Sequence, residues 1–136
     1  MREHLTAALA LAAGLALPGL AQAATTLDQV VNHHMGAFAK NDLDAIVSDY
    51  AEDAIMIHPD QVFQGKAAIR KFFAPMANPK APRLTSKPPT VEGGVASATW
   101  TLGAGTPTAV SGKDVFVIRG GKIQTQVVFI NPPPAK

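Results

Sequence analysis

The hydrophobic pattern of the chain changes its period near Ala81, and this change limits the possible folds more than any other feature of the sequence. Before Ala81, apolar residues recur at helical spacing. The clearest series is Leu27, Val30, Val31, His34, Met35 and Phe38, with one histidine among apolar members. After Ala81, apolar and polar residues alternate, and glycine pairs interrupt the alternation. Helices followed by strands that turn back on one another predict the α+β class.

Two shorter helical patterns and a short hairpin complete the first half of the chain. A second helix is expected to begin after Asn41 or Asp42, either of which can cap it. Its apolar side would carry Leu43, Ile46, Val47 and Tyr50. Residues 54–58 and 61–64 predict two strands joined by a turn, and a third helix follows Gly65. The apolar stripe of that helix is Ile69, Phe72, Phe73 and Met76.

Four further segments predict strands, namely residues 81–92, 95–102, 108–118 and 123–130. The first contains three prolines, which lack the backbone N–H that a sheet uses, so we expect it at an edge or with a bulge. Glycine-rich turns separate the others. We therefore expect a cone-shaped barrel, in which three N-terminal helices pack against a curved, mostly antiparallel sheet with a pocket inside.

Residues 1–23 have the pattern of a secretory signal peptide. Arg2 supplies a basic start, residues 5–17 form an apolar run, and a Pro-Gly pair breaks it. The sequence A-Q-A then matches a cleavage site, which predicts a mature chain from Ala24. The apolar run is too short for a bilayer, which takes about 20 residues. A buried N-terminal helix is the alternative interpretation of the same run.

We expect the mature chain to be exported, to a bacterial periplasm or the medium, and to be free of the membrane after cleavage. Residues 24–131 suffice for a single domain, and residues 132–136 form a proline-rich tail. The chain has no cysteine, which excludes disulfides and thiol nucleophiles. Its net charge of +2 is scattered, so no nucleic-acid stripe is expected, and the sequence predicts no cofactor.

Three polar residues stand where burial would give them a chemical role. His34 lies on the apolar face of the first helix, as a core histidine bonded to a backbone carbonyl or as a pocket residue. His58 ends the first strand, facing either water or the pocket as a base. Asp114 alternates in phase with Phe116 and Ile118. If that face points inward, the carboxylate is buried and needs a partner or a raised pKa; if it points outward, Asp114 is an ordinary surface acid.

Large apolar side chains would form the walls of such a pocket, although the same side chains could serve as plain core. The candidates for contact with an apolar small-molecule ligand are Met56, Phe63, Phe72, Trp100, Phe116 and Phe129. His34, His58 and Asp114 could alternatively make a three-ligand metal site with an open position. Their spacing has no local signature such as H-x-x-x-H, so no metal is predicted.

The sequence also resembles a known superfamily along nearly the whole mature chain. The resemblance is carried by "VVNHHMGAFAKNDLDAIVSDYAEDAIMIHP", "GKAAIRKFF" and "DVFVIRGGKI". These segments are similar to the nuclear transport factor 2-like superfamily, which includes ketosteroid isomerases, SnoaL-like polyketide cyclases and scytalone dehydratase. The resemblance implies the cone-shaped fold, and it is not specific for one reaction.

Within that superfamily the pattern looks most like ketosteroid isomerase. The helix-one tyrosine of that enzyme corresponds to His34, its base before a proline to His58, and its protonated aspartate to Asp114. One of three residue types is kept, which argues against steroid isomerisation but not against a pocket. The resemblance implies an isomerase or dehydratase, in which His58 is the base and Asp114 and His34 donate hydrogen bonds to an apolar carbonyl or hydroxy compound.

The same fold also serves proteins without catalytic activity. The alternative function is therefore a non-catalytic ligand-binding or dimeric accessory protein. Members of the fold commonly pair through the open face of the sheet, so a homodimer is expected. Simple alternation predicts that this face carries Val115, Val117, Gln124, Gln126 and Val128.

Overall fold

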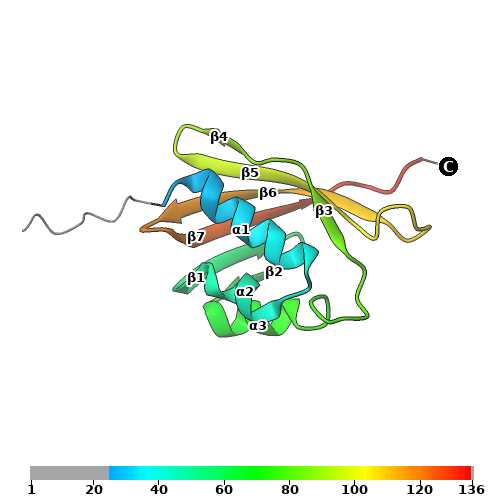
Figure 1. Cartoon of the computed structure of the whole chain (residues 1–136), viewed down its shortest axis with the longest axis horizontal. Helices are drawn as coiled ribbons and strands as arrows, with labels where there is room; N and C mark the ends of the chain where they lie inside the picture. Colours follow the sequence, from blue (N-terminus) through cyan, green and yellow to red (C-terminus); the bar gives the residue numbers. More distant parts are fainter. Residues whose placement is uncertain (1–24, 136) are drawn as a thin grey trace, which may run out of the picture.

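The computed structural model describes residues 25–135, so the predicted signal peptide lies outside the described residues. Three helices and seven strands follow one another in this part of the chain (Figure 1). In order they are α1 (Leu27–Ala39), α2 (Leu43–Ser48), β1 (Tyr50–His58), β2 (Gln61–Gln64), α3 (Lys66–Phe73), β3 (Leu84–Ser86), β4 (Thr90–Glu92), β5 (Val95–Leu102), β6 (Val110–Arg119) and β7 (Lys122–Ile130). Within this range, no helix is both long enough and apolar enough to span a membrane.

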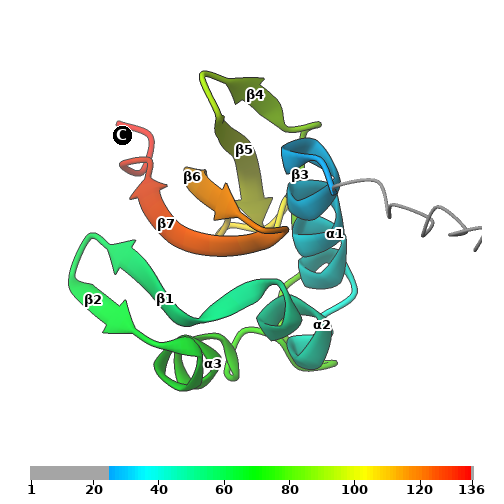
Figure 2. The ribbon, with the colours of Figure 1, turned by 90° about the vertical axis from the view of Figure 1, so that its left-hand side faces the viewer.

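All seven strands belong to one curved sheet, ordered β2-β1-β7-β6-β5-β3, with β4 also paired to β5. Neighbouring strands are antiparallel except β1 and β7, which are parallel. The predicted α+β class and the mostly antiparallel sheet are confirmed. The predicted barrel does not close, because β2 and the short β3 remain at opposite edges of the sheet (Figure 2).

The helices cover the concave side of this sheet. α1 lies across β3, β4 and β5, whereas α3 packs against β1 and β2 (Figures 1 and 2). Of the two candidate caps for α2, the structure selects Asp42, whose Oδ1 accepts a hydrogen bond from the backbone N–H of Ala45 at 3.1 Å. Asn41 instead adopts a positive φ of 53°. Its side-chain amide donates to the carbonyl oxygens of Asn78 and Ala81, which holds the loop before β3.

Two elements differ from the sequence-based expectation. Helical spacing predicts Tyr50 on the second helix, but α2 ends at Ser48, and Tyr50 starts β1 by pairing with Ile123 of β7. The segment 81–92 is not one strand, because it is divided into β3 and β4, which pair with different parts of β5. The division falls at the Lys87-Pro88-Pro89 segment, where prolines cannot donate to a strand ladder.

A β-bulge in β7 sets which side chains face inward. Val117 pairs with Thr125, but the next residue of β6 pairs with Ile123, so Gln124 is an extra residue. The bulge places both Ile123 and Gln126 on the inner face, where they are buried. A one-residue shift reverses the facing of every later side chain in a strand.

The bulge corrects the predicted outer face of the sheet. Gln126 and Val128 pair with Phe116 and Asp114, and both line the cavity rather than the outer face. The outer face instead carries Val115, Val117, Val127 and Phe129, together with Ile57 and Val62 of the β1–β2 hairpin. Homodimerisation through this face stays a prediction.

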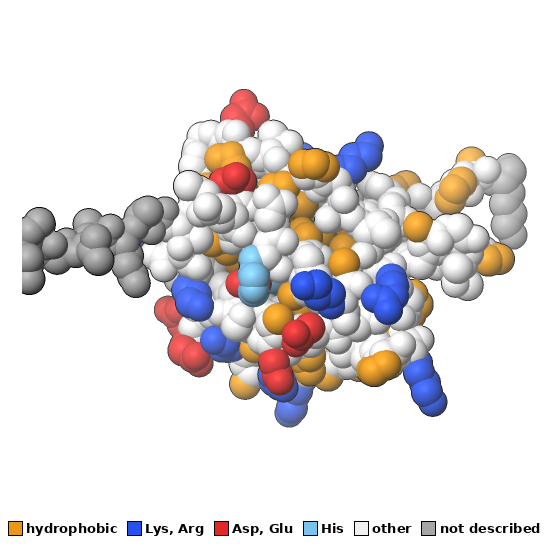
Figure 3. Space-filling view, in the orientation of Figure 1, with side chains coloured by type: hydrophobic (Ala, Val, Ile, Leu, Met, Phe, Trp, Pro, Cys, Tyr) orange, Lys and Arg blue, Asp and Glu red, His pale blue; other side chains and the backbone are white. Residues whose placement is uncertain are grey.

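The core lies between α1, α3 and the inner face of the sheet. Its fully buried side chains include Val31, Ile46, Tyr50, Met56, Ile69 and Phe116. On the face shown in Figure 3, Lys and Arg side chains are interspersed with Asp and Glu, and neither charge forms a continuous stripe there. Buried polar groups are therefore the features of this fold that need a functional explanation.

Candidate functional site

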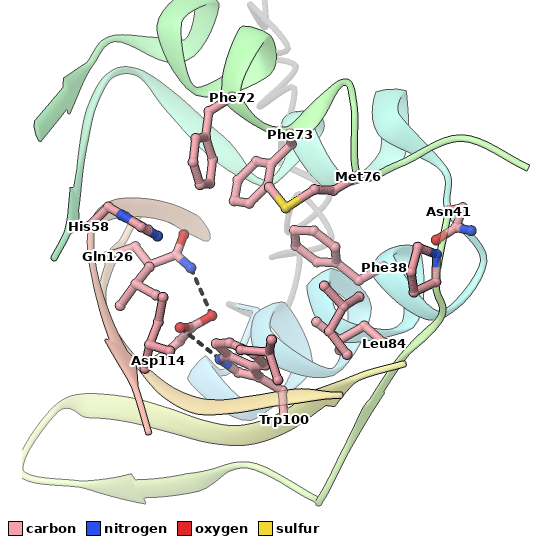
Figure 4. A pocket seen from close by; sticks show the side chains of 15 residues that line it. Phe38, Asn41, His58, Phe72, Phe73, Met76, Leu84, Trp100, Asp114 and Gln126 are labelled. Carbon is pink, nitrogen blue, oxygen red and sulfur yellow. Dashed lines mark hydrogen bonds between the residues drawn. The ribbon is translucent and has the colours of Figure 1, made fainter. Parts of the chain in front are cut away.

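A cavity of about 190 Å³ opens between α3 and the inner face of the sheet (Figure 4). Fifteen residues line it, of which four are polar, namely Asn41, His58, Asp114 and Gln126, and the other eleven are apolar. An apolar cavity of about 150 Å³ accommodates benzene, and drug-sized ligands take about 300 Å³ or more. The cavity therefore suits a compound of one or two rings and is small for a steroid.

Asp114 is the buried acid of this cavity. Its strand β6 alternates strictly, which puts Asp114 and Phe116 on the inner face, and Asp114 is only 6% exposed. Its Oδ1 accepts from the indole N–H of Trp100 at 2.9 Å, and its Oδ2 accepts from the side-chain amide of Gln126 at 2.9 Å (Figure 4). Of the two alternatives for Asp114, the structure selects the inward, buried one.

The protonation of Asp114 is shifted toward neutral pH. Burial raises the pKa of its carboxyl from 3.8 to about 6, because a desolvated carboxylate loses its hydration. The hydrogen bond from Trp100, the charge of His34 and the hydrogen bond from Gln126 act in the opposite direction and limit the rise in pKa. Both forms of the carboxyl are therefore populated near pH 6, the property expected of an acid–base group.

The Trp100 side chain depends on a glycine directly across the ladder. Trp100 pairs with Gly112 of β6, and a Cβ atom at Gly112 would collide with the Trp100 ring and with the carbonyl oxygen of Phe129. The absence of a side chain at Gly112 thus lets the indole lie over β6 and reach Asp114. This close approach could not be predicted from the sequence, because it requires the β5–β6 register.

We expect Gly112→Ala to displace the indole, weaken its bond to Asp114 and destabilise the fold by about 1–3 kcal/mol. Urea unfolding gives the stability, and the fluorescence of Trp100, the single tryptophan, reports the displacement. Gly36→Ala in α1 is the control, since a Cβ there meets nothing within 4 Å. Unchanged fluorescence and stability in Gly112→Ala would contradict the steric role of this glycine.

His58 also lines the cavity, at the end of β1. Its side chain is 16% exposed, its ring packs against Phe72 at 5.2 Å between centroids, and the ring points toward the cavity (Figure 4). The Nδ1 atom lies 3.5 Å from the backbone nitrogen of Asp60 and 3.8 Å from its carboxylate. Among residues 25–135, the Nε2 atom has no hydrogen-bond partner. His58 and Asp114 thus meet the same cavity from different strands.

His34 does not line the cavity. It is completely buried, and its ring contacts the rings of Phe38, Tyr50 and Phe116 edge-on. Its Nδ1 lies 3.3 Å from a carboxylate oxygen of Asp49, and its Nε2 lies 3.3 Å from the Tyr50 hydroxyl. His34 is therefore a core histidine, as one sequence alternative held, although its partners are side chains and not a backbone carbonyl. Donation from His34 to a ligand stays a prediction, and in this geometry both ring nitrogens of His34 face protein side chains.

Asp49, the acidic partner of His34, also forms a hydrogen bond with a histidine at the surface. Asp49 accepts from Nδ1 of His33 at 2.8 Å, and the side chain of His33 is 59% exposed. Burial alone would raise the pKa of Asp49, but the hydrogen bonds and charges of His34 and His33 outweigh burial and lower it. Asp49 is thus held as a carboxylate beside the buried imidazole.

Of the six predicted wall residues, two line the cavity, Phe72 and Trp100. Met56 and Phe116 are fully buried in the core, and the partly buried Phe63 packs against that core and against the ring of Phe72. Phe129 is 53% exposed on the opposite face of β7, because the bulge at Gln124 reverses its side.

Sequence reasoning misses the polar residues that connect Asp114 to His34. Simple alternation assigns Gln126 to the outer face, and helical spacing assigns Tyr50 to a helix. In the structure the Tyr50 hydroxyl donates to Oε1 of Gln126, and the amide of Gln126 donates to Asp114. Alternation groups Gln126 with Val128, but only the bulge places this pair on the inner face, so the sequence alone carries no signal for the role of Gln126.

The geometry does not support the alternative in which His34, His58 and Asp114 form a metal site. Within the described part of the chain, no group of three His, Cys, Asp or Glu side chains could hold a metal ion. His34 lies behind the cavity wall, bonded to Asp49 and Tyr50, whereas His58 and Asp114 line the cavity itself.

Comparison with known proteins agrees with this architecture. The model of the SnoaL-like domain matches residues 31–126, which is more than half of the chain. Among proteins with curated functions, none matches the chain.

Solved structures share the fold at low sequence identity. A nuclear transport factor 2-like protein of unknown function from Burkholderia xenovorans has a TM-score of 0.67 and 19% identity, over 79% of this chain and 84% of that one. A candidate polyketide cyclase from Sinorhizobium meliloti has a TM-score of 0.63 and 24% identity, over 73% and 92%. TerC, crystallised with polyporic acid, has a TM-score of 0.63 and 19% identity, over 76% and 89%.

Proposed function

The chain belongs to the SnoaL-like domain family, and from that premise we propose that it is a pocket enzyme, an isomerase or dehydratase that acts on a small apolar carbonyl or hydroxy compound. The observation that carries the proposal is Asp114, a buried carboxyl with a pKa of about 6 on the wall of an otherwise apolar cavity. Titratable groups perturbed in this way concentrate at functional sites.

His58 and Asp114 have complementary roles in this proposal. The Nε2 atom of His58 takes a proton from a carbon next to the carbonyl group, and protonated Asp114 donates a hydrogen bond to the oxygen as negative charge develops there. Return of the proton to another carbon completes an isomerisation. In a dehydration, protonated Asp114 gives its proton to the departing hydroxyl group, which leaves as water.

The apolar walls support both steps. A cavity with few polar groups excludes water, which strengthens the electrostatic interaction of Asp114 with the ligand. Phe72 and Phe73 of α3, together with Met76 in the turn that follows, form the wall that faces Asp114 and Trp100 (Figure 4). That TerC was crystallised with polyporic acid supports a small organic ligand for a cavity of this fold.

Isomerisation of cyclohex-3-enone to its conjugated isomer tests the proposal with a probe of one ring. We expect the protein to accelerate the reaction and Asp114→Asn and His58→Asn to reduce the rate by about 10²–10⁴-fold, the usual contribution of an acid–base group. The control is Asp53→Asn on β1, an exposed carboxylate that also accepts from a glutamine, Gln124, and it should leave the rate unchanged.

The outcome also separates the two candidate functions. If cyclohex-3-enone perturbs the NMR resonances of the cavity residues but is not converted faster than in buffer, the protein is a non-catalytic ligand-binding protein. If the probe neither binds nor reacts, the proposed substrate class is wrong.

A further inference from the structure

A chain of hydrogen bonds joins the cavity to a buried ion pair behind it. Asp114 accepts from Gln126 at 2.9 Å, the oxygen of Gln126 accepts from Tyr50, and the Tyr50 hydroxyl lies 3.3 Å from Nε2 of His34. The other ring nitrogen of His34 faces Asp49 at 3.3 Å. His34, Tyr50 and Gln126 are each at most 1% exposed, so the chain is isolated from water along its length.

The direction of these bonds limits which ring nitrogens of His34 can carry a proton in this arrangement. The single proton of Tyr50 is given to Gln126, so the Tyr50 oxygen can only accept from Nε2 of His34. The Nδ1 atom of His34 must donate as well, because its partner Asp49 is a carboxylate. With the amide of Gln126 donating to an ionised Asp114, this arrangement requires both ring nitrogens of His34 to carry protons.

A second arrangement satisfies every group when the three hydrogen bonds between Asp114 and His34 are reversed. When Asp114 is protonated, its hydroxyl donates to the oxygen of a Gln126 amide rotated by half a turn, and the amide nitrogen donates to Tyr50. The Tyr50 hydroxyl then donates to Nε2 of His34, which must be unprotonated. Nδ1 of His34 still donates to Asp49, so the imidazole is neutral.

We propose that Gln126 is a positioning residue whose amide orientation ties the charge of Asp114 to that of His34. Relative to the first arrangement, His34 has lost one proton and Asp114 has gained one, and the summed charge of Asp49, His34 and Asp114 is −1 in both. The cavity wall can thus carry either an ionised or a neutral carboxyl at Asp114, and no net charge enters the interior. The inference rests on the proposed function only in that the ligand meets Asp114.

The surrounding charged and polar groups are compatible with this exchange. Trp100 donates to the other oxygen of Asp114 in both arrangements, since either form of the carboxyl retains an acceptor there. His33 holds Asp49 from the solvent side. His58 is the other titratable group that lines the cavity, and its nearest acid is Asp60, which is exposed. None of these groups needs to move when the Gln126 amide rotates.

The test is the protonation state of the His34 ring, read from its ¹⁵N chemical shifts in the ligand-free protein at pH 7.5. In the wild type, where Asp114 is mostly ionised, we expect both ring nitrogens of His34 to carry protons. In Asp114→Asn, the new amide can only donate to the oxygen of Gln126, which imposes the reversed arrangement. His34 should then be neutral with its proton on Nδ1.

Replacing Gln126 distinguishes coupling through the hydrogen-bond chain from direct charge attraction between Asp114 and His34. Gln126→Met keeps the charge of Asp114 and the length of the side chain, so charge attraction alone would preserve the response of His34 to Asp114→Asn. We expect the response to be lost in the Gln126→Met background and retained in the Gln124→Met control, where the replaced glutamine of the same strand bonds to Asp53 at the surface. Tyr50→Phe breaks the chain at another bond and must give the same loss.

The proposal is overturned if His34 has the same protonation state in the wild type and in Asp114→Asn. It is also overturned if Gln126→Met leaves the response intact. A comparison of the wild type with Asp114→Asn decides the first point even if Gln126→Met fails to fold. The measurement is made without a ligand, so failure of cyclohex-3-enone to bind or react would count against the proposed function and leave this result standing.

Discussion

Asp114→Asn is expected to make the protein more stable than the wild type at neutral pH, by about 3 kcal/mol at pH 7. The value follows from the pKa of Asp114, which burial raises from 3.8 to about 6, because a tenfold change in the acid dissociation constant corresponds to about 1.4 kcal/mol. Asparagine has nearly the same shape and can keep both bonds, accepting from Trp100 and donating to a rotated Gln126.

The sign of the pH dependence is opposite to that of a salt-bridged acid. The unfolded chain ionises Asp114 from about pH 4 upward, whereas ionised Asp114 is penalised in the folded protein, so the stability of the wild type falls relative to that of Asp114→Asn as pH rises through this range. The difference between Asp114→Asn and the wild type should therefore be only about 0.5 kcal/mol at pH 4 and grow to its full size by pH 7.

Urea unfolding of both proteins at pH 4, 5, 6 and 7 measures this difference. Asp53→Asn is the matched control, because Asp53 also accepts from a glutamine on β7 but is exposed, and it should change stability by less than about 0.5 kcal/mol at each pH. A difference that does not increase with pH would show that ionised Asp114 is not penalised in the folded protein.

The periodic features of the fold could be predicted from the sequence because they follow from local patterns. The helical spacing between Leu27 and Phe38 marks α1, and strict alternation around Asp114 places this acid on the same face as Phe116. Two of the three groups expected at the cavity, His58 and Asp114, do line it.

The features that could not be predicted depend on pairing between distant segments. The bulge at Gln124 arises from the pairing of β7 with β6, and no local sequence pattern predicts it. Simple alternation therefore assigns Gln126 and Phe129 to the wrong faces. Tyr50 continues the helical spacing of α2, but it belongs to β1 because it pairs with Ile123 of β7. For this reason, the connection between His34 and Asp114 becomes visible only in the folded protein.

His34→Phe is expected to destabilise the protein by about 3–5 kcal/mol, the usual effect of removing one partner of a buried charged pair. Phenylalanine can keep the edge-on contacts of this fully buried ring with Phe38 and Phe116, but it cannot bond to Asp49 or Tyr50. The loss therefore reports the polar contacts and not the packing. Urea unfolding at pH 7, followed by Trp100 fluorescence, measures it.

A second substitution identifies which lost contact matters most. In His34→Phe, the carboxylate of Asp49, whose side chain is 12% exposed, keeps only the exposed His33 as a partner. Neutralising it in the double variant with Asp49→Asn should recover about 1–3 kcal/mol, the penalty of an unsatisfied buried group. His33→Phe is the control and should cost no more than about 1 kcal/mol, since its partner contact is at the surface. If His34→Phe costs no more than His33→Phe, the buried imidazole does not carry the charge that the hydrogen-bond directions require, and the carboxylate of Asp49 is stabilised from the solvent side alone.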